Sequence, residues 1–541
     1  MSASYFKRDW MLFVFLSILV AICYIPSLPN TFVSDDIGAI VENGLLHSAL
    51  PPFFHFSGSL RVSLYWLMYH LGNQPALYRS INIFFHIGAV WLVFLILRRL
   101  STKAVGIIVA TLFAIHPLMT ESVTWISGGV YVQYAFFTLL AFYFYITAEK
   151  NMKRYAISIL SFLMALSTSE KAIVFPFILL SYEVALGSLK INWKKISVFV
   201  LVSCIFFSFV FISGRVGNRI SSVISDSPSS KIMMNPLLQL PAAISSYLFL
   251  ILWPDKLTLY HSDFVLTPVE FLFRLFVTIA YLGGMVYVWK KNKFIFFWLS
   301  FFLISLLPTL TPLPIAWVVA ERYVYLGTIG IITVIAYIAI HVCQKKAHRR
   351  LLLLLGTLII VLLAARTMAR NADWKNADAL WIATARVSPS SAQNHNNLGD
   401  MYGRHGDKKR AVEEFTTAIS INPSYAEAYH NLGNAYTDLG MLPQAIASYE
   451  KAVAFKPSLW QSYQNLAAVY SAKKDYKKAE QYLKQAIVIN PSNSNLRTNL
   501  AVIYLLEGNK TEAKNLIQLI LATEPTNKQA KAILQAIEHE P

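Results

Sequence analysis

The chain has 541 residues, of which 56% are hydrophobic, 14% aromatic and only 14% charged. Its mean hydropathy is +0.48, whereas soluble domains have roughly 45–50% apolar and about 25% charged residues. This composition excludes a disordered chain and predicts a polytopic membrane protein. The net charge of +18 lies mainly in residues 1–366, where 28 Lys and Arg against 13 Asp and Glu give +15. A basic excess confined to apolar sequence is what the positive-inside rule produces, so nucleic acid is excluded as a partner.

The sequence contains eleven apolar runs, most of which approach the roughly 20 residues that a helix needs to cross a bilayer, while several are shorter. They predict an all-α, polytopic transmembrane domain over residues 1–368. The expected spans lie near residues 10–28, 78–97, 104–119, 124–147, 155–168, 170–188, 196–213, 267–289, 294–309, 318–341 and 350–366.

Clusters of Lys and Arg orient these spans. All of them fall on the cytoplasmic side if the chain crosses eleven times from a cytoplasmic N-terminus. The apolar run 240–254 is then re-entrant or lies in the outer interface, because a further crossing would place later clusters outside. The short cytoplasmic start and compact loops favour a multi-pass bacterial inner-membrane protein with a periplasmic C-terminal region. The clusters are Lys7-Arg8, Arg98-Arg99-Lys103, Lys150-Lys153-Arg154, Lys190-Lys194-Lys195, Lys290-Lys291-Lys293 and Lys345-Lys346-Arg349-Arg350.

The C-terminal third is a repeat array with the tetratricopeptide (TPR) period of 34 residues. Proline recurs at this interval, and small residues alternate with Leu, Tyr and Phe in the TPR pattern. We predict a connecting half-repeat helix over residues 369–391, four repeats over 392–525 and a C-terminal capping helix over 526–541. The concave face of such an α-solenoid binds protein or peptide. The repeated prolines are Pro389, Pro423, Pro457, Pro491 and Pro525.

Two adjacent carboxylates, Asp35 and Asp36, follow the first span. Acidic residues at a membrane boundary are costly, so one could act as a general base while the other positions a ligand or a metal. The alternative is an Asp that caps the following helical segment.

A second outer loop contains His116 and Glu121. His116 is a candidate base or ligand, although a lone boundary histidine is more often a structural hydrogen-bonding group. Glu121 is the better acid–base or metal candidate, with a helix N-terminal carboxylate as its alternative role.

Three further segments reach the same side. Ser169-Glu170-Lys171 forms a short hairpin tip, which pattern alone assigns to a turn with a local ion pair. Glu321-Arg322-Tyr323 opens a span, where the arginine fork can hold a phosphate with tyrosine beside an isoprenoid chain. The alternative is an interfacial arginine paired with Glu321. The loop Tyr260-His261-Ser262-Asp263 adds polar contacts.

The absence of a Walker loop, a dinucleotide fingerprint and a GxSxG elbow disfavours nucleotide-driven transport and serine hydrolysis.

Together these segments resemble the transmembrane and TPR O-mannosyltransferases of the C-type (GT-C) glycosyltransferase superfamily. The resemblance covers nearly the whole chain. It is carried by Phe32-Val33-Ser34-Asp35-Asp36, His116-Pro117 with Glu121-Ser122-Val123 and Trp125-Ile126-Ser127-Gly128, Ser169-Glu170-Lys171, Asn235-Pro236, Leu252-Trp253-Pro254, Ala320-Glu321-Arg322-Tyr323-Val324-Tyr325-Leu326 and Arg370-Asn371-Ala372-Asp373-Trp374.

The resemblance implies a hexosyltransferase that takes mannose or a similar sugar from a polyprenyl-phosphate carrier on the non-cytoplasmic face. It implies that the first outer loop supplies the catalytic carboxylate, Asp35 or Asp36, and that Arg322 grips the carrier phosphate. We add Glu121 as a catalytic candidate, and Glu321, Tyr323, His116 and Lys171 as substrate-binding candidates. The expected partners are the lipid-linked sugar donor, membrane lipids and a protein acceptor. Use of a divalent cation stays open, because no ligand cluster decides it.

Two other functions remain. One is a non-catalytic membrane-anchored TPR scaffold for envelope assembly, and the other is a GT-C enzyme that modifies a glycan or lipid. The class of molecule that receives a labelled sugar distinguishes an enzyme that modifies proteins from one that modifies a glycan or lipid. Loss of sugar transfer on substitution of Asp35 and Asp36 distinguishes an enzyme from a scaffold.

Overall fold

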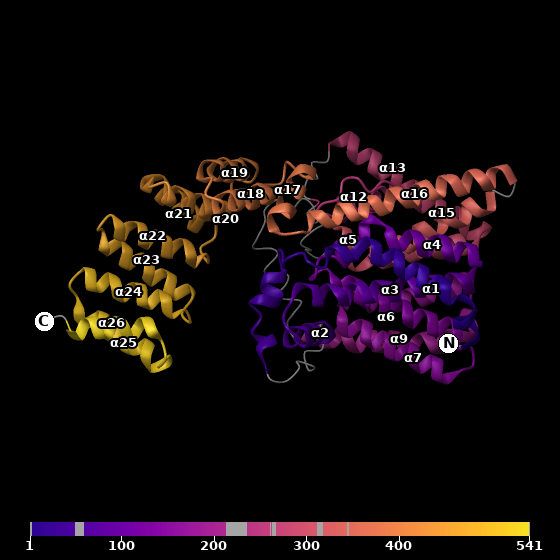
Figure 1. The fold of residues 1–541 in the computed structure, drawn as a ribbon, viewed down its shortest axis with the longest axis horizontal. Helices are drawn as coiled ribbons and strands as arrows, with labels where there is room; N and C mark the ends of the chain where they lie inside the picture. Colours follow the sequence, from indigo (N-terminus) through magenta and orange to yellow (C-terminus); the bar gives the residue numbers. More distant parts are fainter. Residues whose placement is uncertain are drawn as a thin grey trace. The chain divides into compact units, whose positions relative to one another are not determined.

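The computed structural model describes residues 3–48, 59–212, 235–259, 261, 267–310, 318–342 and 346–539. It forms two compact units, residues 1–387 and 388–541, shown in Figure 1. All regular secondary structure in the described residues is helical, which confirms the all-α prediction.

The first unit is a bundle of apolar helices. Its α-helices are α1 (Ala3–Tyr24), α2 (Ser59–His70), α3 (Pro75–Leu100), α4 (Lys103–Ile115), α5 (Thr120–Val123), α6 (Gly129–Ala148), α7 (Met152–Thr168), α8 (Phe175–Ala185), α9 (Leu189–Ile212), α12 (Pro236–Leu252), α13 (Pro268–Lys291), α14 (Lys293–Leu306), α15 (Thr328–Val342), α16 (Lys346–Asp373) and α17 (Ala377–Val387). Short helical segments join them: η1 (Ile25–Ser27), η2 (Ile37–Val41), η3 (Gly44–His47), η4 (Pro117–Met119), η5 (Glu170–Val174), η6 (Leu307–Thr309) and η7 (Glu321–Val324).

Each of the eleven predicted spans coincides with a helix, but the helices differ in length. Within the described residues, six are long and apolar enough to cross a membrane alone, namely those in α1, α3, α6, α9, α13 and α16. The pair α4 and Pro117–Val123, bent by 54°, supplies a seventh. The other predicted spans hold α7, α8, α14 and α15, with 17, 11, 14 and 15 residues. Helices α8, α14 and α15 are short because η5, η6 and η7, respectively, occupy one end of the apolar run. Eleven is therefore an approximate number of membrane spans.

Charged residues join helix ends at one end of the bundle. Asp9 near the start of α1 forms ion pairs with Arg98 at the end of α3 and with Lys103 at the start of α4. Arg99 pairs with Glu149, which follows α6, at 2.8 Å. These contacts gather the helix ends that carry three of the predicted cytoplasmic clusters. The opposite ends of α1 and α4 lead into the loops that carry Asp35, Asp36 and Glu121.

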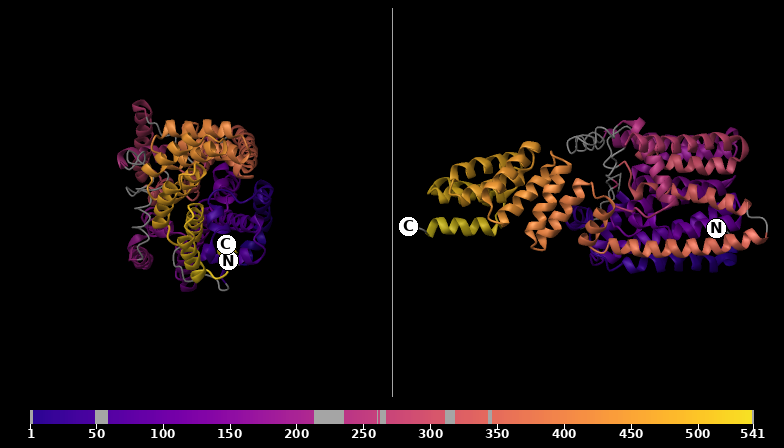
Figure 2. Two further views of the ribbon diagram at one scale, coloured as in Figure 1. Left: turned by 90° about the vertical axis from the view of Figure 1, so that its left-hand side faces the viewer. Right: turned by 90° about the horizontal axis from the view of Figure 1, so that it is seen from above.

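The second unit is an array of helix pairs. It contains α18 (Ala392–Arg404), α19 (Lys408–Ile421), α20 (Ala426–Asp438), α21 (Leu442–Phe455), α22 (Trp460–Ala472), α23 (Tyr476–Ile489), α24 (Ser494–Leu506), α25 (Lys510–Thr523) and α26 (Lys528–His539). Figure 2 shows the pairs stacked in chain order.

Small residues allow the two helices of a repeat to approach closely. A Cβ atom on Gly399 would lie 2.6 Å from the ring of Phe415, and one on Gly433 would lie 2.5 Å from the ring of Tyr449. The aromatic ring thus fills the space that glycine leaves, as the sequence pattern predicts.

The turns within the repeats share one backbone conformation. Gly406, Gly440, Lys474 and Gly508 follow each other at intervals of 34 residues, and all have a positive φ, at 82°, 72°, 62° and 82°. Glycine adopts this conformation without steric cost, whereas Lys474 does not. The third repeat therefore carries a strained turn.

Candidate active site

The two adjacent aspartates face different surroundings. Asp35 is exposed, and its Oδ1 accepts a hydrogen bond from the Ser34 hydroxyl at 3.4 Å. Asp36 is fully buried. Its Oδ1 accepts from the backbone N–H and the hydroxyl of Ser127 at 2.8 and 2.7 Å, and its Oδ2 accepts from the Val33 N–H at 3.2 Å. Asp36 therefore joins the first outer loop to the second, and its side chain does not cap η2.

Burial controls the protonation of Asp36. Removal from water raises the pKa of its carboxyl group from 3.8 to about 6, because the charged form loses hydration. The hydrogen bonds from Ser127 and Val33 and the charge of Arg79 oppose this shift only in part.

Glu121 and Arg322 form a buried ion pair between the second outer loop and η7. One carboxylate oxygen of Glu121 contacts the guanidinium, and the other accepts the backbone N–H of Arg322 at 2.6 Å. Glu121 is completely buried, whereas 10% of the Arg322 side chain is exposed. The carboxylate thus fixes both the main chain and the side chain of Arg322.

A second cation lies near Arg322. The Lys171 ammonium is 4.9 Å from the centre of the Tyr323 ring and 5.4 Å from that of Tyr131. The guanidinium carbon of Arg322 is 5.0 Å from the same Tyr323 ring. Both positive charges therefore contact one aromatic side chain, and Tyr323 is itself buried. The chain segments at Lys171 and Arg322, distant in sequence, meet here.

Glu321 does not pair with Arg322, its neighbour in sequence. Its Oε1 accepts from Arg370 at 3.1 Å, and the Nε2 of His261 lies 3.8 Å from the same oxygen. The alternative of an ion pair between Glu321 and Arg322 is wrong, because Glu321 pairs with Arg370 and Arg322 pairs with Glu121. Of the predicted loop 260–263, only His261 lies within the described residues.

His116 makes structural contacts with both ring nitrogens. Nδ1 accepts the backbone N–H of Leu118 at 3.3 Å, and Nε2 lies 3.0 Å from the carbonyl oxygen of Ile251. The ring thereby fastens the second outer loop to α12. A substrate contact would require one of these bonds to break.

Trp125 connects the aspartate turn to Arg322. Its indole N–H donates to the carbonyl of Val33 at 3.4 Å, and the guanidinium carbon of Arg322 lies 5.3 Å from its ring centre. Its ring also stacks on Trp374, with 5.6 Å between centroids and 25° between planes. Sequence reasoning assigned no role to Trp125, because its contact with Arg322 joins residues that are distant in the chain.

Arg79 is another buried residue beside the candidate site that the sequence analysis missed. It is buried near the start of α3, donates to the carbonyls of Thr124 at 2.9 Å and Thr31 at 2.5 Å, and also contacts the Asn30 carbonyl. An arginine within an apolar run was the available signal. It holds the two outer loops together.

No metal centre is formed by the part of the chain that the structure describes, where no group of three or more His, Cys, Asp and Glu could hold an ion. Use of a divalent cation stays a prediction.

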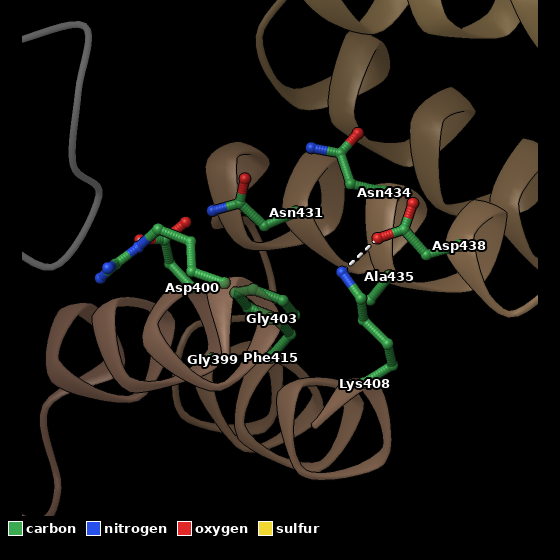
Figure 3. Close-up of a pocket in the computed structure, with 10 residues that line it drawn as sticks. Gly399, Asp400, Gly403, Lys408, Phe415, Asn431, Asn434, Ala435 and Asp438 are labelled. Atoms are coloured by element: carbon green, nitrogen blue, oxygen red, sulfur yellow. Dashed lines mark hydrogen bonds and ion pairs between the residues drawn. The ribbon is translucent and has the colours of Figure 1, made fainter. Parts of the chain in front are cut away.

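The second unit contains a separate cavity of about 190 Å³ between its first two repeats, shown in Figure 3. The Phe415 side chain is part of its lining, and a Cβ on Gly403 would meet only open space and the Ala411 methyl at 3.9 Å. The lining comprises Gly399, Asp400, Gly403, Arg404, Lys408, Phe415, Asn431, Asn434, Ala435 and Asp438.

Asparagine amides run from this cavity along successive inner helices. Asn431 donates to Asn396 at 3.0 Å, and Asn465 donates to Asn434 at 2.7 Å. The amides thus link α18 to α20 and α20 to α22.

Comparisons with known proteins agree with both parts of this description. Tetratricopeptide repeat families match residues 399–440, 426–459 and 470–537. Protein O-mannosyl-transferase TMTC3 of Homo sapiens is 24% identical in an alignment of 459 residues that covers 73% of this chain and 50% of the relative. Protein O-mannosyl-transferase F38B6.6 of Caenorhabditis elegans is 24% identical over 75% of this chain and 62% of its own length.

The resemblance to the transmembrane and TPR O-mannosyltransferases is confirmed. The chain spans half to about three fifths of these relatives' length. Among solved structures, MamA protein is 24% identical and covers 29% of this chain and 84% of its own, with a TM-score of 0.26. The apolar helices of the first unit and the TPR array of the second make this chain a multi-pass membrane protein with a TPR domain.

Proposed function

We propose that the chain is a membrane glycosyltransferase that moves mannose or a similar hexose from a polyprenyl phosphate to hydroxyl groups of proteins. The observation that carries the proposal is the position of Trp125. It contacts the loop of Asp35 and Asp36 on one side and Arg322 on another, so an acid-bearing turn and an anion-binding cation belong to one site. The names of the relatives support the same reaction class.

Arg322 and Lys171 supply the charge that a lipid phosphate requires. In the proposed reaction, the bond between the sugar C1 and the phosphate oxygen breaks, and both electrons leave with the polyprenyl phosphate. The two cations stabilise the negative charge that grows on this leaving group. Glu121 keeps the Arg322 guanidinium oriented, and Tyr323 supplies an apolar surface beside both cations.

Asp35 is the proposed general base. Its carboxylate is exposed, whereas the Asp36 carboxylate is buried and accepts three hydrogen bonds from the protein. A Ser or Thr hydroxyl of the acceptor would attack C1 and give its proton to Asp35, so a new glycosidic bond replaces the phosphate ester. Asp36 holds the turn that presents Asp35. This assigns different roles to two residues that the sequence leaves equivalent.

The distribution of charge supports a site on the non-cytoplasmic side. The site loops leave the helix ends opposite the Arg98–Asp9–Lys103 cluster, and basic clusters mark the cytoplasmic side of membrane proteins. On this basis we propose that the N-terminus lies in the cytoplasm and the site on the non-cytoplasmic face; the bacterial periplasm as that compartment stays a prediction from the compact loops and short N-terminal segment.

The TPR array is proposed to hold the acceptor polypeptide. Asparagine amides have both donors and acceptors, which match the N–H and C=O groups of an extended peptide. The cavity that Phe415 helps to line would accommodate one side chain of that peptide.

The test is transfer by the full chain in proteoliposomes. Polyprenyl-phosphate mannose with a radiolabelled sugar is added together with envelope proteins, and other labelled hexoses are compared. The proposal predicts label in protein that is released by β-elimination. Label in a lipid or glycan would show that the acceptor is not a protein and would favour the alternative enzyme, which modifies a glycan or lipid. No transfer from any carrier, together with full partner binding by the array, would favour the TPR scaffold.

A further inference from the structure

The segment that follows the last predicted span packs into the candidate active site. Arg370, Asn371 and Trp374 are all buried, at 0%, 3% and 0% exposure. They lie where α16 ends, and the chain continues from there through α17 to the TPR array. A segment that only linked two domains would have no reason to bury a cation, an amide and an indole against loops far away in sequence.

Asn371 fixes the beginning of the outer loops. Its side-chain N–H donates to the Cys23 carbonyl at 2.5 Å, and its side-chain oxygen accepts from the Thr124 hydroxyl at 2.5 Å. Its backbone carbonyl accepts from the Asn30 amide at 3.2 Å. One residue thus connects the end of α1, the first outer loop and the loop that carries Trp125.

Trp374 continues this contact as a stack. The Arg370 guanidinium carbon lies 5.7 Å from the Trp374 ring centre, and the Trp374 ring stacks on Trp125. Trp125 in turn contacts Arg322, whose neighbour Glu321 pairs with Arg370. The contacts form a closed circuit through five side chains and one peptide bond. The circuit is thus a continuous chain of contacts from Trp374 to Arg322.

We propose that Trp374 and Asn371 are positioning residues of the sugar-transfer site, which set the location of Trp125 and through it the phosphate-binding guanidinium of Arg322. This inference rests on the proposed function, because it takes the Arg322 ligand to be a polyprenyl phosphate. Positioning groups matter because a misplacement of about 1 Å can lower a rate about 100-fold. The Trp374 indole N–H has no hydrogen-bond partner in the described residues, so the stacked ring is the feature that this position uses.

The experiment compares three substitutions at Trp374 in the full chain. Trp374→Leu keeps an apolar side chain but removes the stack, whereas Trp374→Phe keeps an aromatic ring. Trp193→Ala is the matched control, because Trp193 is 55% exposed on α9. The third variant, Trp374→Ala, reports the cost of the cavity by thermal unfolding. Binding of sugar-free polyprenyl phosphate and the donor KM and kcat are measured for each.

The inference predicts that Trp374→Leu weakens polyprenyl phosphate binding and raises the donor KM about tenfold or more, with an unfolding temperature close to that of Trp374→Phe. The donor KM of Trp374→Phe should stay within about threefold of the wild-type value, and the donor KM of Trp193→Ala should equal the wild-type value. Equal binding by Trp374→Leu and the wild type would overturn the inference. Equal losses in Trp374→Leu and Trp374→Phe would also overturn it.

Asn371→Ala gives an independent readout if a Trp374 variant fails to fold. It should raise the donor KM in the same direction, and an unchanged KM would contradict the inference. Failure of the proposed function is distinguishable. A wild-type protein that binds polyprenyl phosphate but transfers no sugar would end the transfer proposal while the binding comparison still decides the positioning role. A wild type that binds no polyprenyl phosphate would overturn both.

Discussion

Glu121 and Arg322, 201 positions apart in the chain, are joined twice: through the guanidinium and through the Arg322 backbone N–H. The double contact leaves the arginine little freedom to turn away from its partner. A buried charge that loses its partner is costly, at about 3–5 kcal/mol. The pair is therefore both a structural joint between two loops and the means by which the proposed site presents a positive charge.

Substitution of Arg322 by lysine tests the need for a guanidinium. Lysine keeps the charge but loses the planar fork and the stacking on Trp125 and Tyr323. We expect the donor KM to rise at least tenfold and kcat to fall, measured with labelled donor in proteoliposomes. Arg99→Lys at the opposite end of the bundle is the control, since Arg99 pairs with Glu149 on the exposed surface. Similar kinetics for the two variants would argue against a phosphate contact by Arg322.

The raised pKa of Asp36 predicts a dependence of stability on pH. The folded pKa of about 6 exceeds the ordinary value of 3.8, so the folded state binds this proton more tightly than the unfolded state does. The stabilisation is complete below pH 4 and is lost as pH rises through 6, by about 3 kcal/mol for about two pKa units. Thermal unfolding of the wild type and of Asp36→Asn between pH 4 and 7 measures it. The wild type should lose stability relative to the variant over this range, and parallel curves would refute the prediction.

Gly128 is expected to tolerate no side chain. A Cβ there would lie 2.2 Å from the Glu121 carbonyl oxygen and 3.0 Å from the Trp125 ring. Gly128→Ala should therefore shift both residues, destabilise the fold by about 1–3 kcal/mol and lower the transfer rate. Gly38→Ala is the control close to Asp36, because a Cβ at Gly38 meets nothing within 4 Å. Unchanged transfer and unfolding in Gly128→Ala would show that the loop relaxes without effect on the site.

Lys474 offers a stabilising substitution in the TPR array. Its φ of 62° is costly for a side chain with a Cβ, and the equivalent positions 406, 440 and 508 hold glycine. Lys474→Gly should stabilise the third repeat by about 1 kcal/mol, read as slower hydrogen exchange in α22 and α23. Lys473→Gly, at a residue with φ of −80°, should give no such gain. Equal effects of the two changes would contradict this explanation.

Much of the fold could be predicted because it follows local periodicity. The 34-residue proline spacing and the small-residue positions define the helix pairs that the array contains, and apolar runs mark every predicted span. The lengths of the membrane-spanning helices were harder to predict, because η5, η6 and η7 interrupt the apolar runs where the chain turns toward the candidate site. Composition does not report such a change of helix type.

The site was only partly predictable, because its pairings join residues distant in sequence. Sequence order suggests Glu321 as the partner of Arg322, whereas the fold gives that place to Glu121. Asp35 and Asp36 are adjacent and chemically identical, and the contacts that Asp36 makes with Ser127 and Val33 in the fold distinguish a buried carboxylate from an exposed one. The stack of Trp125 on Trp374 likewise depends on loops that meet only in the folded chain.

The central claim is tested most directly by the turnover of Asp35→Asn with saturating polyprenyl-phosphate mannose and a protein acceptor. Because Asp35 is exposed, the variant should fold and bind donor as the wild type does. Loss of a general base predicts a fall in kcat of about 100-fold or more. A kcat within about threefold of the wild type would contradict the account.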